Sequence, residues 1–150
     1  MDGFLRQVKE RAEQAGVFGE ITLAEGMLCC AALASAEPAS YRLERQEETW
    51  HVSLVTPDRW LSESIEADLL HTGDPIEELV EDELIDLGYE GPRLPVKHFR
   101  SDDMLYTFRS PIPIDPANEA AAVEAAARCL LAYEAAFREL GNMQTAEEGR

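Results

Sequence analysis

The clearest alternation of hydrophobic and polar positions lies between residues 104 and 109. Every second position from 104 to 108 is a large apolar or aromatic residue: Met104, Tyr106 and Phe108. A period of two is typical of a strand with one buried side, so the sequence predicts a strand over 104–109. We expect Pro111 and Pro113 to end it, because proline lacks the backbone N–H that a sheet ladder needs.

A helical stripe follows these prolines. Its apolar residues recur at alternating spacings of three and four, which marks one face of a helix: Val123, Ala126, Leu130, Tyr133, Phe137 and Leu140. Asp115 and Pro116 are the residue types preferred at an N-cap and at the first helical position. The pattern therefore predicts a helix over 115–140 that forms the main wall of the core.

Strand-like segments also occur in the first third of the chain. The apolar run 27–34 fits either a helix or a buried strand. The segments 41–44 and 50–54 alternate apolar and polar residues, and the polar residues 45–48 between them suit a hairpin connection. We therefore interpret 27–34 as the first of three consecutive antiparallel strands.

Two further helices are predicted on either side of these strands. An amphipathic pattern over 3–15 predicts the first, with Gly16 as its expected end. The second is expected over 57–71, where Thr56 has the residue type of an N-cap and Pro57 that of the first helical position.

The middle of the chain predicts one more helix and a short strand. Asp74 followed by Pro75 indicates a helix over 74–87, and Glu77 has the position of the acidic residue in a capping box. After a proline-rich connector, residues 96–99 are expected to pair as a strand with the segment 104–109.

Together these elements predict the fold class. Their order is α-β-β-β-α-α-β(-β)-α, and segregated strands and helices are typical of α+β proteins. We expect an antiparallel sheet of four or five strands with helices packed on it. A chain of 150 residues suits a single domain, here 1–141, followed by a frayed C-terminal tail over 142–150.

The charge balance is strongly acidic, with 30 Asp and Glu against 13 Lys and Arg and a net charge of −17. It disfavours binding to nucleic acid or to a membrane surface, because both need cations that replace counterions. No apolar core of a signal peptide is visible, and the longest apolar run, of eight residues, is too short to cross a bilayer. We therefore expect a cytoplasmic protein.

The acidic residues concentrate between Arg59 and Arg93, a stretch without lysine or arginine. The densest group lies on the predicted helix 74–87 and supplies the candidate partner-binding residues: Glu77, Glu78, Glu81, Asp82, Glu83 and Asp86. One interpretation is a face for a basic partner. The other is a solvated helix face, since repulsion between like charges one turn apart costs only about 0.2–0.5 kcal/mol per pair.

Residue types suited to catalysis or metal binding form no recognisable motif. Asp68, His71 and Asp74 have only loosely metal-like spacing, and no nucleophile shares a motif with His51 or His98. The three cysteines fit buried, reduced thiols that pack as small hydrophobes: Cys29, Cys30 and Cys129. We therefore expect no enzymatic activity, no cofactor and no metal.

The last third of the chain resembles a bacterial fold group. The residues that carry the resemblance are 106–114, with the sequence Tyr-Thr-Phe-Arg-Ser-Pro-Ile-Pro-Ile, leading into the helical segment 120–140. This order is similar to that of the type III secretion chaperone-like group, which includes the YbjN-like sensory transduction regulators. The resemblance implies an α+β domain that binds another protein, often as a dimer, and has no catalytic residues.

The resulting hypothesis is a non-enzymatic bacterial protein-binding module, chaperone- or regulator-like. Two alternatives are an acidic decoy of a nucleic-acid-binding surface and a small-molecule binder or enzyme with an unrecognised site. We also expect a homodimer, because Val55 and Leu105 would make the second face of the sheet partly apolar and an identical subunit could cover it. Alternatively, the two acidic helices cover that face and close a monomer.

Overall fold

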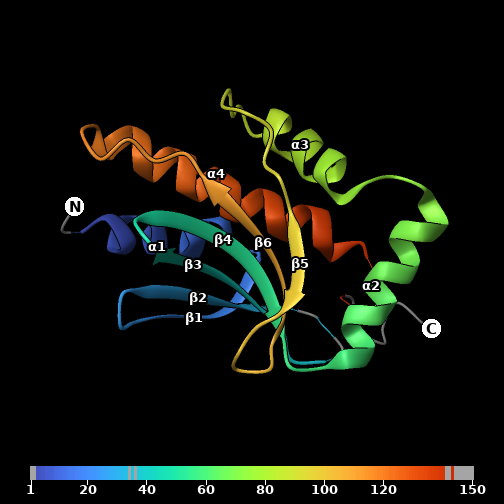
Figure 1. Cartoon of the computed structure of the whole chain (residues 1–150). Helices are drawn as coiled ribbons and strands as arrows, with labels where there is room; N and C mark the ends of the chain where they lie inside the picture. Colours follow the sequence, from blue (N-terminus) through green and yellow to red (C-terminus); the bar gives the residue numbers. More distant parts are fainter. Residues whose placement is uncertain (1–2, 34, 36, 141–142, 144–150) are drawn as a thin grey trace.

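The computed structural model of the chain describes residues 3–33, 35, 37–140 and 143. Its elements follow in the order α1 (Phe4–Ala15), β1 (Phe18–Ala24), β2 (Met27–Ala32), β3 (Ser40–Gln46), β4 (Thr49–Thr56), α2 (Arg59–Thr72), α3 (Ile76–Asp86), β5 (Lys97–Arg100), β6 (Tyr106–Ile112) and α4 (Glu119–Arg138). Figure 1 shows a twisted sheet with α1 and α4 against one side. The predicted α+β class is confirmed.

The sheet is antiparallel and has six strands in the order β1-β2-β3-β4-β6-β5. The first four strands form a meander of consecutive hairpins, and β6 then pairs with both β4 and β5. The strand interpretation of the apolar run 27–34 is confirmed by β2. The predicted count of four or five strands is too low by the strand β1.

β1 escaped the sequence analysis because its alternation is broken. Phe18 pairs with Ala32, but the next pair in register is Ile21 with Cys30, so the strand bulges between these two positions. A bulge sets two residues opposite one and changes which side chains face the core. A search for a period of two therefore passes over this segment.

β6 continues through Pro111, contrary to the prediction for that residue, and ends at Ile112, directly before Pro113. Pro111 pairs with His51 of β4. On the other side of β6, pairing with β5 extends only to Arg109, so Pro111 lies where β6 is an edge strand, the place in a sheet that tolerates proline. The strand also starts later than expected, at Tyr106, because Met104 has a φ of +69° in the preceding turn.

The core lies between the sheet and the helices α1 and α4. All six residues of the predicted stripe on α4 are buried, with Leu130 and Phe137 at 1% and 0% exposure. Tyr133 of this stripe forms a hydrogen bond of 2.5 Å with the Ser110 hydroxyl of β6, which joins helix and strand. The predicted tail 142–150 lies outside the described residues except for Met143, which is buried.

Two helices begin later than their proline signals predict. α2 is capped by Asp58, whose carboxylate accepts a hydrogen bond of 2.8 Å from the backbone N–H of Leu61. Thr56 is not its N-cap because this residue still pairs in β4. α4 is capped by Asn118, whereas Asp115 accepts a hydrogen bond in the turn before the helix.

α3 begins after Pro75 without any hydrogen bond from a capping side chain, so the capping box predicted from Asp74 and Glu77 is wrong. The Glu77 carboxylate instead accepts a hydrogen bond of 3.3 Å from the backbone N–H of Val96 in the connector. Glu77 thus accepts a hydrogen bond from a residue distant in the sequence, whereas the local pattern predicted that it would cap the start of α3.

The acidic helices do not cover the second face of the sheet. α3 packs on α4, and α2 lies beside β5 on the side of the sheet that α4 covers (Figure 1). The predicted closure of a monomer by these two helices is therefore wrong. Within the described part of the chain, one whole face of the sheet remains without a helix.

Candidate functional site

The uncovered face of the sheet carries the candidate site. Residues directly opposite each other in antiparallel strands point to the same face. One row of such residues crosses four strands here: Arg42 of β3, Ser53 of β4, Arg109 of β6 and Lys97 of β5. We name these four residues the cationic row.

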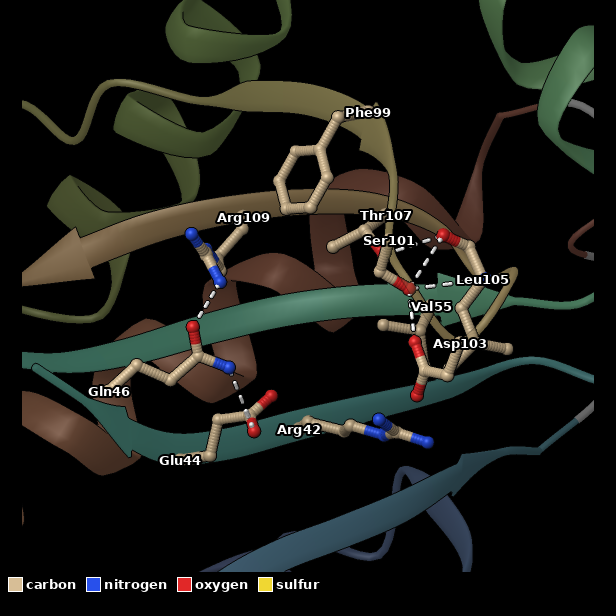
Figure 2. Close-up of a pocket in the computed structure, with 10 residues that line it drawn as sticks. All are labelled: Arg42, Glu44, Gln46, Val55, Phe99, Ser101, Asp103, Leu105, Thr107 and Arg109. Carbon is tan, nitrogen blue, oxygen red and sulfur yellow. Dashed lines mark hydrogen bonds between the residues drawn. The ribbon is translucent and has the colours of Figure 1, made fainter.

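A pocket of about 90 Å³ lies on this face. Ten residues line it: Arg42, Glu44, Gln46, Val55, Phe99, Ser101, Asp103, Leu105, Thr107 and Arg109. Figure 2 shows their side chains on the near side of the strands, with α4 behind the sheet. The pocket is therefore built by the sheet itself and by the turn between β5 and β6.

The cations of the row form no close ion pair in the described part of the chain. The nearby Asp103 carboxyl has a lowered pKa, first because it accepts a hydrogen bond from Ser101 and last because of the charge of Arg42. Among the described residues, no carboxylate oxygen lies within 4.0 Å of Arg42, Arg109 or Lys97, although the chain has 30 acidic residues. Arg109 donates a hydrogen bond of 2.7 Å to Gln46, and its guanidinium carbon lies 5.0 Å from the ring centre of Phe99. Because opposite residues of like charge repel, Arg109 facing Lys97 weakens the sheet.

Polar atoms of this face are also buried without a hydrogen-bond partner in the described part of the chain. They are Arg42 Nε, Ser53 Oγ and His51 Nδ1. Ser53 is 1% exposed, and burying an unpaired hydroxyl costs about 1–3 kcal/mol. Burial, and then the charge of Arg109, lower the pKa of His51. Buried polar groups are normally hydrogen-bonded, so a face that gathers several unpaired ones is unusual.

An apolar strip runs beside the cationic row. Val55, Thr107 and Phe99 lie opposite one another, and Leu105 lines the same pocket. Val55 and Thr107 are 5% and 4% exposed. The expectation that Val55 and Leu105 point away from the helices is confirmed by their place in this pocket.

The six predicted acidic residues lie around α3 rather than on one face. Three of them follow its exposed side one turn apart: Glu78, Asp82 and Asp86. Glu77 bonds the connector, and Glu81 lies 3.8 Å from Arg93 of the same connector. Glu83 is half-buried, and burial first and Asp86 second raise its pKa. Half of the set is thus engaged within the fold, and we place the candidate site on the cationic row.

A second polar constellation joins α2 to β5. His98 Nε2 lies 3.1 Å from Ser62 Oγ, and His98 Nδ1 lies 2.7 Å from Glu66 Oε2. Burial lowers the pKa of His98, and the nearby Glu66 carboxylate opposes that shift. The sequence analysis missed this grouping because Ser62 and Glu66 are one helical turn apart, whereas His98 comes from a distant strand.

The order serine, histidine, carboxylate matches that of a hydrolase triad. Ser62 is only 3% exposed, however, and the His98 ring stacks on Phe108 with 3.8 Å between ring centres. A triad needs its nucleophile open to a substrate carbonyl, and this serine is closed off. We interpret the constellation as a clip that fastens β5 to α2.

The cysteines divide between the two faces of the sheet and the helix layer. Cys30 and Cys129 are buried, and burial raises the pKa of each thiol to about 12, as expected for inert thiols. Cys29 differs, since it is half-buried and lies opposite Arg42 on the uncovered face. It continues the cationic row onto β2.

Asp68, His71 and Asp74 are not brought together, and in the described part of the chain no three His, Cys, Asp or Glu side chains gather as a metal ion would require. None of the helices described in the structure has both the length and the apolar character needed to cross a membrane. Comparison with protein-family models, curated proteins and solved structures finds no match to the chain. The resemblance to the YbjN-like regulators therefore stays a prediction.

Proposed function

We propose that the chain is a non-enzymatic bacterial protein-binding module whose partner covers the uncovered face of the sheet. The observation that supports this most directly is the composition of that face. It combines the half-buried apolar Phe99 and Leu105 with cations that have no carboxylate oxygen within 4.0 Å among the described residues. A sheet face that only meets water is normally polar, whereas arginine and aromatic residues are enriched at protein interfaces.

A second copy of the chain is the other occupant that this face could receive. Twofold pairing of two such faces would be isologous, which means that both copies would use the same surface for the contact. It would also bring two cationic rows together, each with Arg42, Arg109 and Lys97. We therefore favour a different protein as the main partner, with self-association as a weaker, competing state.

Site-specific photo-crosslinking in the native cells tests the proposal. A photoreactive amino acid replaces the exposed Gln46 on the uncovered face and, as a matched control, the exposed Glu10 on α1. We expect a defined adduct from position 46 and none from position 10. Equal adducts from both positions, or none from position 46, would contradict the proposal, and an adduct of twice the chain mass would identify a second copy as the occupant.

A further inference from the structure

We infer that the cationic row is a carboxylate-binding site through which the module recognises an acidic, extended segment of its partner. The inference rests on the proposed function and specifies the chemistry of the partner. It is carried by the register of four strands, which brings three cations into one row, and by the absence of any carboxylate oxygen within 4.0 Å of these cations among the described residues.

The geometry of the row suits one carboxylate above Ser53. Neighbouring strands lie about 4.8 Å apart, so Arg42 and Arg109 flank Ser53 at about that distance on either side. A carboxylate placed there has a guanidinium on each side. Ser53 Oγ and Arg42 Nε are buried, so neither contacts it, and the other guanidinium nitrogens of Arg42 and Arg109 would hold it. Hydrogen bonds of this charged kind are about twice as strong as neutral ones.

Lys97 extends the site to a second carboxylate. The midpoint between Arg109 and Lys97 lies about one and a half strand spacings, or about 7 Å, from Ser53. Alternate side chains of an extended chain are separated by about 6.6–6.8 Å on one side. Two acidic residues with one residue between them therefore match the row.

The surroundings of the row favour an acidic protein segment over nucleic acid. The chain carries a net charge of −17, which repels a long polyanion more strongly than a short acidic segment. Glu44 and Asp103 also line the pocket and would lie against a continuous phosphate backbone. Isolated carboxylates bound to the row can avoid both, and the half-buried Phe99 and Leu105 beside it offer apolar contact to the rest of a peptide.

Nuclear magnetic resonance on the ¹⁵N-labelled protein tests this inference at low salt. The probe is the peptide acetyl-Glu-Ala-Glu-Ala-Glu-amide, and its glutamine counterpart is the control ligand. We expect the acidic peptide to shift the backbone amide signals of the cationic row and the Nε–H signal of Arg42 in a saturable manner. The glutamine peptide should leave these signals in place.

Variants separate the row from general charge effects. Arg109→Gln should weaken peptide binding at least about tenfold, because it removes one of the two guanidinia that hold the carboxylate. Arg6→Gln makes the same charge change at an exposed position of α1 and should alter the affinity by less than about twofold.

Three results would overturn the inference: no saturable shift at the row, equal shifts with the glutamine peptide, or equal weakening by Arg6→Gln and Arg109→Gln. A single-stranded oligonucleotide that shifts the row at lower concentration than the peptide would overturn the partner class. Crosslinks from position 46 without carboxylate binding would leave the proposed function standing and refute this inference alone.

Discussion

At the scale of single residues, substitutions in the buried stripe on α4 test directly how much core packing stabilises the fold. Leu130 and Phe137 are 1% and 0% exposed. Leu130→Ala and Phe137→Ala should each lower the free energy of unfolding by about 2–5 kcal/mol, because each change removes buried contacts and leaves a cavity. Urea denaturation measures this. The exposed Glu139→Ala is the control, and equal effects of all three changes would show that the stripe does not form the core.

Two histidines give the stability a pH dependence. Burial lowers the pKa of His98 and of His51, with Glu66 opposing the shift at His98 and Arg109 adding to it at His51. A histidine whose folded pKa lies below its unfolded value of about 6.5 takes up a proton more readily in the unfolded chain. The free energy of unfolding should therefore decrease as the pH falls from about 7.5 to about 6.

Two histidine variants test whether His98 causes this pH dependence. His98→Gln should reduce the slope of unfolding free energy against pH, whatever it does to the stability itself. His71→Gln changes an exposed histidine and should keep the slope of the unaltered protein. An identical slope in all three proteins would show that His98 does not carry the effect.

At the scale of elements, the helix starts provide a direct comparison between local pattern and structure. Asp58→Ala should lower the free energy of unfolding by about 0.5–2 kcal/mol, because Asp58 accepts the hydrogen bond that caps α2. Asp74→Ala should change it by less than about 0.5 kcal/mol, since α3 has no side-chain cap. Thermal denaturation of both variants measures these losses of stability. A larger loss for Asp74→Ala than for Asp58→Ala would show that Asp74 caps α3, as the local sequence pattern predicted.

Regular elements were predictable from the sequence because their periods are unbroken. The stripe from Val123 to Leu140 and the alternation within β3 reflect a single buried side throughout. The errors fall where a long-range contact overrides a local preference. Thr56 has the residue type of an N-cap, yet it pairs with Tyr106 in the sheet. Pro111 has the residue type of a strand end, yet it lies at a tolerated edge of β6.

The candidate site was less accessible to sequence analysis than the fold. Alternation with the core residues Leu43 and Val52 shows that Arg42 and Ser53 point away from the helices. It does not show which residues of a later strand lie opposite them. That register places Arg109 next to Ser53, and it depends on pairing between segments separated by two helices.

At the scale of the whole molecule, self-association through the uncovered face stays a prediction. We expect light scattering at physiological salt to give a mass above the 16.7 kDa of one chain, rising with protein concentration toward twice that value. At low salt the net charge of −17 on each copy is less screened, so the mass should be closer to 16.7 kDa. The half-buried Cys29 on this face should react more slowly with a thiol reagent when the dimer forms.

The acidic peptide should compete with that dimer, because both occupy the cationic row. Adding it at physiological salt should return the mass toward 16.7 kDa, and the glutamine peptide should not. A mass of 16.7 kDa at every salt and at high protein concentration would refute self-association and leave carboxylate recognition to be judged on the peptide binding alone.

The place of β6 between β4 and β5 also sets an order of folding events. Each of β1, β2 and β3 pairs with the next strand along the chain, whereas β4 meets β6 only after the chain has passed through α2, α3 and β5. Bringing distant segments together lowers the entropy of the chain before their contacts can stabilise it. We therefore expect the meander β1–β4 to form early and the β4–β6 pairing to form late. A newly made chain would then pass through a stage with the edge of β4 unpaired, and at that stage aggregation competes with folding.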